Sequence, residues 1–301
     1  TYSLEVVDAN EEPVAGAIVR VLEPAQFGWY EADENGLVEL SFATLPADGR
    51  VVGSVEHPQR REGAVFAISR ERSDDAIVQL QLLTTVTGRV TNENDSGIEG
   101  AVVEASTMLD GAGGIVTLWR TTSGSGGRWS WPAAVPHVAL ALQASAVDET
   151  GVVTGQSAPV TTLPGDSAPK KTDALVLPGV KSQRAALDTK YEWRKLPVIC
   201  GSLSADPTNA TVIVHAPVNQ YTVFADGLAN VSRVLRRQDV SVAIVVNGDV
   251  DCGESNVLTL RGNAPSRGTV YLVNARSEVV FEGFDLPPVA AILDAAGSAG
   301  R

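Results

Sequence analysis

An internal repeat constrains the fold of this chain more than any other feature. Residues 6–21 read VVDANEEPVAGAIVRV, and residues 90–105 read VTNENDSGIEGAVVEA. Without a gap, an offset of 84 residues aligns five identical pairs: Val6 with Val90, Asn10 with Asn94, Gly16 with Gly100, Ala17 with Ala101 and Val19 with Val103. Such self-similarity indicates one supersecondary unit built twice.

Both copies continue with a tryptophan followed by a turn signal. Trp29 and Trp119 each lie seven residues before a glycine, Gly36 and Gly126 respectively. The segment before Gly36 ends in Glu-Asn-Gly, a tight-turn signal because Asn and Gly tolerate positive φ. In the second copy, Ser-Gly-Ser-Gly-Gly provides a looser turn. The spacing predicts that these two Trp–Gly pairs are equivalent.

Short apolar strands at regular intervals, with turn signals between them and little helical periodicity, are typical of a β-sandwich. We therefore predict a mainly β protein, with tandem antiparallel Ig-like β-sandwiches followed by a β-rich third domain with one or two short helices. The expected domains are residues 1–83, 84–179 and 180–301. The first two of these are called the first and second repeat below.

The repeats resemble the carboxypeptidase regulatory-like, or transthyretin-like, sandwich domain. That family combines a turn rich in Asp, Asn and Gly with a PV-x-GA-x-V pattern and a later T-D-x-x-G turn. The first repeat keeps Pro13, Val14, Gly16, Ala17, Asp33 and Gly36, and the second keeps Gly88, Gly100, Ala101 and Val103. The second departs at Ile98-Glu99, where Pro-Val is expected. The resemblance implies a spacer, adhesive or accessory module without catalytic residues of its own.

The third domain resembles no family that its motifs identify. Strand-like segments include ATVIVHA, QYTVFA, VSVAIVV and GTVYLVN, all between residues 210 and 274. Residues 228–238 place Leu228, Val231 and Leu235 on one helical face, which predicts a crossover helix. Residues 182–196 have the spacing of a linker helix, and the segment PPVAAILDAAGSAGR predicts a short terminal helix.

Charge excludes one class of partner. Residues 1–179 hold 11 Lys and Arg against 24 Asp and Glu, a net charge of −13, while residues 180–301 hold 12 of each. An acidic surface argues against nucleic-acid binding, which requires cationic side chains. No apolar run reaches the roughly 18 residues of a membrane span, so membrane insertion is not expected. The start at Thr1 fits either removal of an initiator Met or cleavage of a presequence.

The only two cysteines, Cys200 and Cys252, both lie in the third domain. They are either a disulfide, which would stabilise the domain by about 3–4 kcal/mol, or two thiols in a reducing cytoplasm. The sequence leaves both alternatives open.

The search for catalytic chemistry finds no established motif, so no enzyme activity, catalytic residue or cofactor is predicted. His57, His137 and His215 lie far apart, and the latter two are flanked by apolar strand residues or Pro, which favours core or rim positions. Residues 247–256 hold weak calcium-ligand candidates, Asp249, Asp251 and Glu254, with Asn256. Their spacing does not match a known calcium loop, and a solvated hairpin is favoured, so no metal is predicted.

Trp119, Trp129 and Trp131 cluster beside the second glycine-rich turn. Alternation places Trp129 and Trp131 on one face of a strand. This face is either the sandwich core, which we favour, or an aromatic platform for glycans.

We predict a non-enzymatic structural or interaction subunit of a large assembly. Its partners are other protein subunits, contacted through residues 180–301, with cell-surface glycans as a further partner if the tryptophans are exposed. A phage virion component, such as a head decoration or tail protein, is slightly preferred over a bacterial surface filament or adhesin subunit, because cysteines are few and no anchor is visible. The alternative is a secreted carbohydrate-binding accessory protein. The expected location is the virion or the cell surface.

Overall fold

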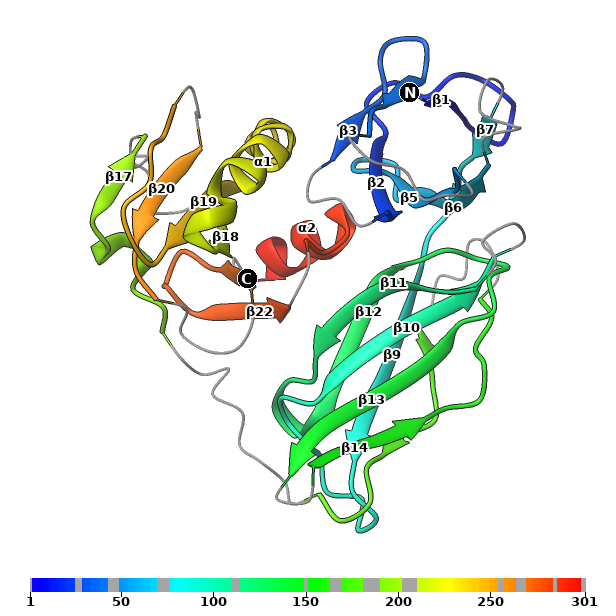
Figure 1. Cartoon of the computed structure of the whole chain (residues 1–301). Coiled ribbons are helices and arrows are strands. Elements are labelled where there is room, and N and C mark those ends of the chain that lie inside the picture. The colour runs from blue at the N-terminus through cyan, green and yellow to red at the C-terminus, as the bar shows by residue number, and fades with distance from the viewer. Residues whose placement is uncertain are drawn as a thin grey trace. The chain divides into compact units, whose positions relative to one another are not determined.

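A computed structural model describes residues 2–24, 29–42, 49–69, 76–109, 114–148, 151–162, 169–180, 190–201, 210–253, 257–263, 269–283 and 286–298. The chain forms two compact units, which are described separately (Figure 1). The N-terminal unit comprises Thr1–Arg184 with Pro288–Ala291, and the C-terminal unit comprises Ala185–Pro287 with Ile292–Arg301. The expected mainly β fold class is confirmed.

The first repeat is a sandwich of a small and a large sheet. The small sheet has the order β4-β1-β7, and the large sheet β3-β2-β5-β6-β8. The strands are β1 (Tyr2–Val7), β2 (Ile18–Glu23), β3 (Tyr30–Glu31), β4 (Leu37–Leu40), β5 (Val51–His57), β6 (Glu62–Ile68), β7 (Ala76–Gln79) and β8 (Gln81–Leu82). Alternate residues of β1 and β4 are buried. They pack with apolar side chains of the large sheet in one cluster, so the core lies between the two sheets.

The second repeat has the same order in the strands that both repeats share, whereas β8 has no counterpart among the described strands of its large sheet. Its small sheet is β12-β9-β15, with β16 also paired to β9, and its large sheet is β11-β10-β13-β14. The strands are β9 (Thr84–Thr91), β10 (Val102–Met108), β11 (Ile115–Thr122), β12 (Arg128–Ala134), β13 (Ala141–Asp148), β14 (Gly151–Gln156), β15 (Lys170–Lys171) and β16 (Leu175–Val176). In the small sheets, β7 pairs parallel to β1, and β15 and β16 pair parallel to β9. The sandwiches are therefore not purely antiparallel, which differs from the expectation.

The turn after the first strand of each repeat explains the ungapped match in the sequence. Asp8 Oδ1 accepts from the Asn10 N–H at 2.8 Å, and Asn92 Oδ1 accepts from the Asn94 N–H at 3.0 Å. Asx turns of this kind use a short polar side chain to replace a backbone acceptor. Later in the turn, Gly16 and Gly100 have φ values of 74° and 72°, a left-handed conformation that favours glycine.

The predicted pairing of Trp29 with Trp119, and of Gly36 with Gly126, is wrong by one residue. Gly36 has a φ of 73°, and a Cβ there would lie 2.6 Å from the Val6 carbonyl oxygen. The residue in the same position of the second repeat is Gly127, also at 73°, whose Cβ would collide with the Val90 carbonyl oxygen. The extra residue lies before this turn, which contains η2 (Ser125–Gly127), because the offset is already 91 residues where Gly16 and Gly100 donate to the carbonyls of Ala32 and Ser123. Spacing alone cannot place it.

The C-terminal unit is built on a six-stranded mixed sheet with the order β17-β20-β19-β18-β21-β22. Its strands are β17 (Val198–Cys200), β18 (Thr211–Ala216), β19 (Ser241–Val246), β20 (Leu258–Arg261), β21 (Val270–Val273) and β22 (Val279–Gly283). Strands β18, β19 and β20 are mutually parallel, and the helix α1 (Tyr221–Arg236) connects β18 to β19. This βαβ crossover confirms the predicted crossover helix.

The helix α1 begins earlier than the sequence analysis expected. Residues 220–225 were predicted to form a strand because Tyr, Thr, Val and Phe favour β structure. Instead, Tyr221, Ala225 and Leu228 lie at helical spacing and are all buried. A parallel connection between β18 and β19 requires a crossover, and burial of this apolar stripe outweighs the local strand preference.

The two other expected helices had different outcomes. The helix α2 (Val289–Ser298) confirms the predicted terminal helix. Of the predicted linker helix, residues 182–189 lie outside the described residues. Its remainder is wrong, because residues 190–196 contain only the 3-10 turn η4 (Trp193–Lys195), and the Tyr191 N–H donates to the Ser277 carbonyl instead of to a helical partner.

Candidate functional site

The carboxyl ends of the parallel strands β18, β19 and β20 meet at one edge of the C-terminal sheet. In open α/β sheets this edge is where ligand sites form. The loop after β19 holds Asp249, Asp251 and Cys252, and β20 ends at Arg261. This edge therefore gathers the acidic and sulfur-containing residues that the sequence analysis singled out.

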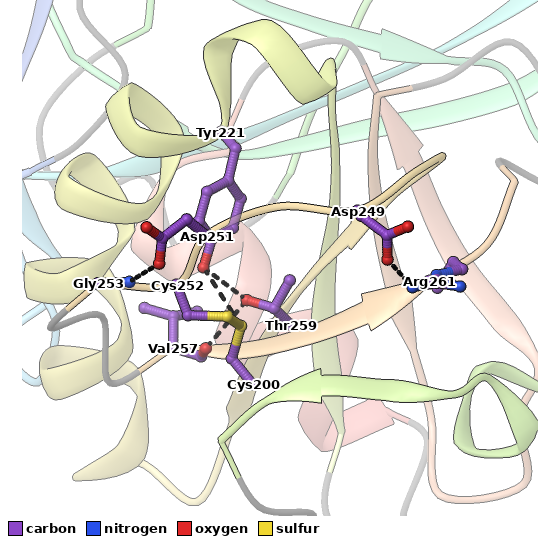
Figure 2. The surroundings of a disulfide bond; sticks show 9 residues. All are labelled: Cys200, Tyr221, Asp249, Asp251, Cys252, Gly253, Val257, Thr259 and Arg261. Atoms are coloured by element: carbon purple, nitrogen blue, oxygen red, sulfur yellow. Dashed lines mark hydrogen bonds and ion pairs between the residues drawn. A yellow bond between two sulfur atoms is a disulfide. The ribbon is translucent and has the colours of Figure 1, made fainter.

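A disulfide joins Cys200 to Cys252, with their Cα atoms 6.2 Å apart (Figure 2). Cys200 ends the edge strand β17, and Cys252 belongs to the loop after β19. The bond encloses a sequence separation of 52 residues, for which the loop-entropy model gives a stabilisation of about 4 kcal/mol. It fastens the shortest strand of the sheet to the loop at the carboxyl edge.

A buried hydroxyl network lies directly beside the disulfide. The Tyr221 hydroxyl is 3.0 Å from Thr259 Oγ1 and 3.9 Å from Cys200 Sγ. Thr259 Oγ1 in turn donates to the Val257 carbonyl at 3.2 Å. Figure 2 shows Tyr221 reaching from the first turn of α1 toward Thr259 on β20. The network thus connects the helix, the sheet and the disulfide, and it leaves the tyrosine hydroxyl satisfied.

The two described acidic candidates do not converge. Asp249 forms an ion pair with Arg261, whereas Asp251 Oδ1 accepts from the Gly253 N–H at 3.1 Å. Figure 2 shows their carboxylates turned away from each other, on opposite sides of the disulfide. Glu254 and Asn256 lie outside the described residues. Among the residues that are described, no three His, Cys, Asp or Glu side chains form a group suited to a metal ion.

A half-buried histidine near the carboxyl end of β18 forms a hydrogen bond with a tyrosine. His215 Nε2 lies 2.9 Å from the Tyr191 hydroxyl, and the Tyr271 ring packs edge-on against both residues. Burial lowers the pKa of His215 to about 4 and raises the pKa of Tyr191, with a smaller contribution from Tyr271. At neutral pH an uncharged imidazole and a neutral phenol therefore share this hydrogen bond, and the histidine tautomer decides which of them donates.

The pairing of Tyr191 with His215 escaped the sequence analysis, which placed His215 only in a core or rim position. The two residues are 24 positions apart, and Tyr191 was expected in a helix. The other two histidines are separate from this pair. His57 Nδ1 accepts from the N–H groups of Gln59 and Arg60, and His137 is exposed in a turn.

The three tryptophans lie in the sandwich core, the position that the sequence favoured over an aromatic platform for glycans. Trp119, Trp129 and Trp131 are 4%, 5% and 3% exposed, and all belong to the core of the second repeat. The rings of Trp119 and Trp131 stack with centroids 5.7 Å apart. A sugar-binding platform needs ring faces that are open to solvent, whereas these rings face one another and the apolar side chains around them.

No helix among the described residues combines the length and the apolar character needed to cross a bilayer. No protein-family model matches the sequence. Curated proteins likewise show no significant match.

Several solved structures with weak similarity are pilus proteins. A streptococcal ancillary pilin is 13% identical over 57% of this chain and 61% of its own, with a TM-score of 0.24. The shaft pilin SpaA of Lactobacillus rhamnosus GG is 12% identical over 60% of this chain and 98% of its own, also at 0.24. A 9R-lipoxygenase of Cyanothece scores 0.22 at 10% identity, over 51% of this chain and 23% of its own. At such scores none of these names is transferred to this protein.

Proposed function

We propose that this chain is a non-enzymatic structural or interaction subunit of an assembly outside the cytoplasm, a surface filament or an adhesin. The disulfide between Cys200 and Cys252 is the observation that carries the proposal. Disulfides persist in oxidising compartments and are rare in the cytoplasm, where thiol systems keep cysteines reduced. A disulfide that fastens an edge strand is a structural bond suited to an extracytoplasmic protein.

The repeated sandwich supports a scaffolding role for the N-terminal unit. The strands common to both repeats follow one order, and each repeat places its large apolar residues between two sheets. We assign both to the carboxypeptidase regulatory-like fold on the motifs described above. A module of this kind extends a protein and presents surfaces to partners, because its interior is filled by side chains.

Residues 180–301 are the proposed attachment domain. The excess negative charge of the chain is confined to residues 1–179, while the remainder has no net charge. Like-charged surfaces repel one another and remain solvated, whereas a neutral surface approaches a partner without that cost. The acidic repeats therefore project into solvent in the proposed arrangement, and the neutral part contacts the other subunits.

The disulfide also helps to choose between the candidate functions. A virion subunit folds in the cytoplasm of its host, where disulfides rarely form, so the surface assembly is now favoured over the phage particle. The secreted carbohydrate-binding candidate depended on exposed tryptophans, and these are buried.

Localisation in the native cell tests the proposal. Antibodies against the full chain are applied to intact and to permeabilised cells of the source, followed by immunogold electron microscopy. We expect label on intact cells and a disulfide that resists thiol alkylation until a reductant is added. Label seen only after permeabilisation, with both thiols free to react, would refute the extracytoplasmic assignment. The attachment role is tested by deletion, since removal of residues 180–301 should abolish incorporation and removal of residues 1–83 should leave it largely intact.

A further inference from the structure

The outer faces of the two small sheets carry different chemistry at equivalent positions. In the first repeat, β1 and β4 place Glu5 opposite Leu37. In the second repeat, β9 and β12 place Arg89 opposite Arg128. Position 89 is offset from position 5 by the same 84 residues as the internal repeat. An acidic and apolar pair in one repeat is therefore replaced by two arginines in the other.

The outer face of the second small sheet, formed by Arg89, Arg128 and Lys171, is called the basic face below. Lys171 on β15 pairs with Thr87, two residues before Arg89 on β9. Only five Lys and Arg residues occur in residues 84–179, and four of them lie on this sheet: Arg89, Arg128, Lys170 and Lys171. All four are exposed.

The basic face concentrates like charges within a protein of net charge −13. Arg89 and Arg128 are direct cross-strand partners, an arrangement that destabilises a sheet when both side chains carry the same charge. At the edge of the basic face, Asp95 Oδ1 lies 3.9 Å from the Arg89 guanidinium, and the Asp95 side chain is 82% exposed. An anionic partner docked on this face would relieve the repulsion between the two arginines.

The outer face of the first small sheet, formed by Leu37, Glu39, Glu5 and Ile77, is called the acidic face. Glu5 lies in one row between Leu37 on β4 and Ile77 on β7. Leu37 is 42% exposed and Ile77 is 62% exposed, while Glu39 is exposed one row further along β4. Two carboxylates thus stand beside two apolar side chains on an open sheet surface.

We propose that the acidic face of one copy of this chain binds the basic face of a second copy. Arginine has an apolar stem and a charged end, so the stems of Arg89 and Arg128 can cover Leu37 and Ile77 while their guanidinium groups reach Glu5 and Glu39. A second copy is the partner that the charges favour, because the complementary surface occurs at the equivalent place of the same molecule.

The two faces belong to different repeats, so the contact is heterologous. Each copy that engages a neighbour through its acidic face keeps its basic face free for a third copy. Heterologous contacts build rings when the rotation closes and open filaments when it does not. The inference rests on the proposed role as an assembly subunit and adds a second contact to it. Residues 180–301 attach the chain to the assembly, and the repeats that project from it then bind neighbouring copies of this chain.

A charge-swap experiment with the full-length protein tests the proposal. Sedimentation velocity is measured over a range of concentrations at low and high salt for the unmodified chain, for an acidic-face variant (Glu5→Arg with Glu39→Arg) and for a basic-face variant (Arg89→Glu with Arg128→Glu). A third variant, Arg60→Glu with Arg61→Glu, matches the basic-face variant in charge but alters exposed residues of the turn between β5 and β6, outside both faces and outside residues 180–301. Circular dichroism establishes that each variant is folded.

The unmodified chain should self-associate at low salt and dissociate as salt screens the contact. Each face variant alone should associate at least about 10-fold more weakly, whereas the charge-matched variant should behave like the unmodified chain. An equimolar mixture of the two face variants should recover association, because each then offers a face complementary to the other. Folded face variants that associate as strongly as the unmodified chain, or an unmodified chain that stays monomeric at millimolar concentration, would overturn the contact. Neither result bears on surface labelling of cells, which tests the proposed function separately.

Discussion

Single residues in this protein are fixed by contacts that their local sequence does not reveal. Gly127 is required because its Cβ position is occupied by backbone atoms of Val90 on β9 and of Ile98. His215 is neutral because it is half-buried beside two tyrosines, one of them 56 residues further along the chain. Composition and spacing identified the residue types, but neither the crowding at Gly127 nor the partner of His215 follows from neighbours in the sequence.

Alanine substitutions at Gly126 and Gly127 should differ strongly in their effect on stability. Both residues have positive φ, at 65° and 73°, so both variants bear the conformational cost of about 1 kcal/mol. Nothing lies within 4 Å of a Cβ at Gly126, whereas a Cβ at Gly127 collides with the Val90 carbonyl. Gly127→Ala should therefore lose at least about 2 kcal/mol more unfolding free energy than Gly126→Ala in urea titrations. Equal losses would show that the collision is relieved by a small backbone shift.

His215 should make the C-terminal unit sensitive to acid. Its folded pKa of about 4 lies below the ordinary value of 6.5, so the unfolded chain binds a proton more readily. The contribution is complete above pH 6.5 and is lost as the pH falls toward 4. After allowance for partial exposure, His215→Gln should remove about 2 kcal/mol of the stability difference between pH 7 and pH 4.

The control for the histidine prediction is His137→Asn. His137 is exposed in a turn, and its φ of 60° suits asparagine. The unfolding free energy of the His137→Asn variant should follow that of the unmodified chain across the same pH range. If His215→Gln also follows the unmodified chain, then the burial of the imidazole does not govern the acid response.

At the scale of elements, those that belong to a repeated pattern could be predicted from the sequence, whereas elements whose tertiary contacts override local propensity could not. The 84-residue offset located the first strand of each repeat, the turn after it and the start of the second strand, since the same backbone conformations recur there. Residues 220–225 were misassigned because their strand-forming side chains lie in a helix that the parallel sheet requires. The disulfide could be posed as an alternative but not decided, because the approach of β17 to the loop after β19 depends on the whole sheet order.

The disulfide should stabilise the C-terminal unit through its hold on β17. Replacing both cysteines, as Cys200→Ala with Cys252→Ala, should cost about 3–4 kcal/mol of unfolding free energy under oxidising conditions. The matched control is the unmodified chain in reductant, whose free energy of unfolding should approach that of the variant. A variant that unfolds at the same denaturant concentration as the oxidised protein would show that the sheet and the Tyr221 network hold β17 without the bond.

At the scale of the whole molecule, two compact units with separate cores predict two unfolding transitions. The stacked tryptophans belong to the N-terminal unit, and the disulfide belongs to the C-terminal unit. In differential scanning calorimetry, Trp131→Ala should lower one transition, consistent with a loss of about 3–5 kcal/mol for a buried tryptophan. Reductant should lower the other. A single transition that responds to both changes would mean that the chain unfolds as one cooperative body.

In each repeat, the strand that comes first in the chain pairs parallel to the strand that comes last in the small sheet, and this pairing has a mechanical consequence. Because β1 runs in the same direction as β7, and β9 in the same direction as β15 and β16, tension on the two ends of a repeat pulls the paired strands lengthwise past each other. The ladder hydrogen bonds then bear the load together instead of opening one after another, as they do when a hairpin is peeled apart. A chain of such repeats resists stretching along its length, which is the property that a tethered extracellular protein needs under flow.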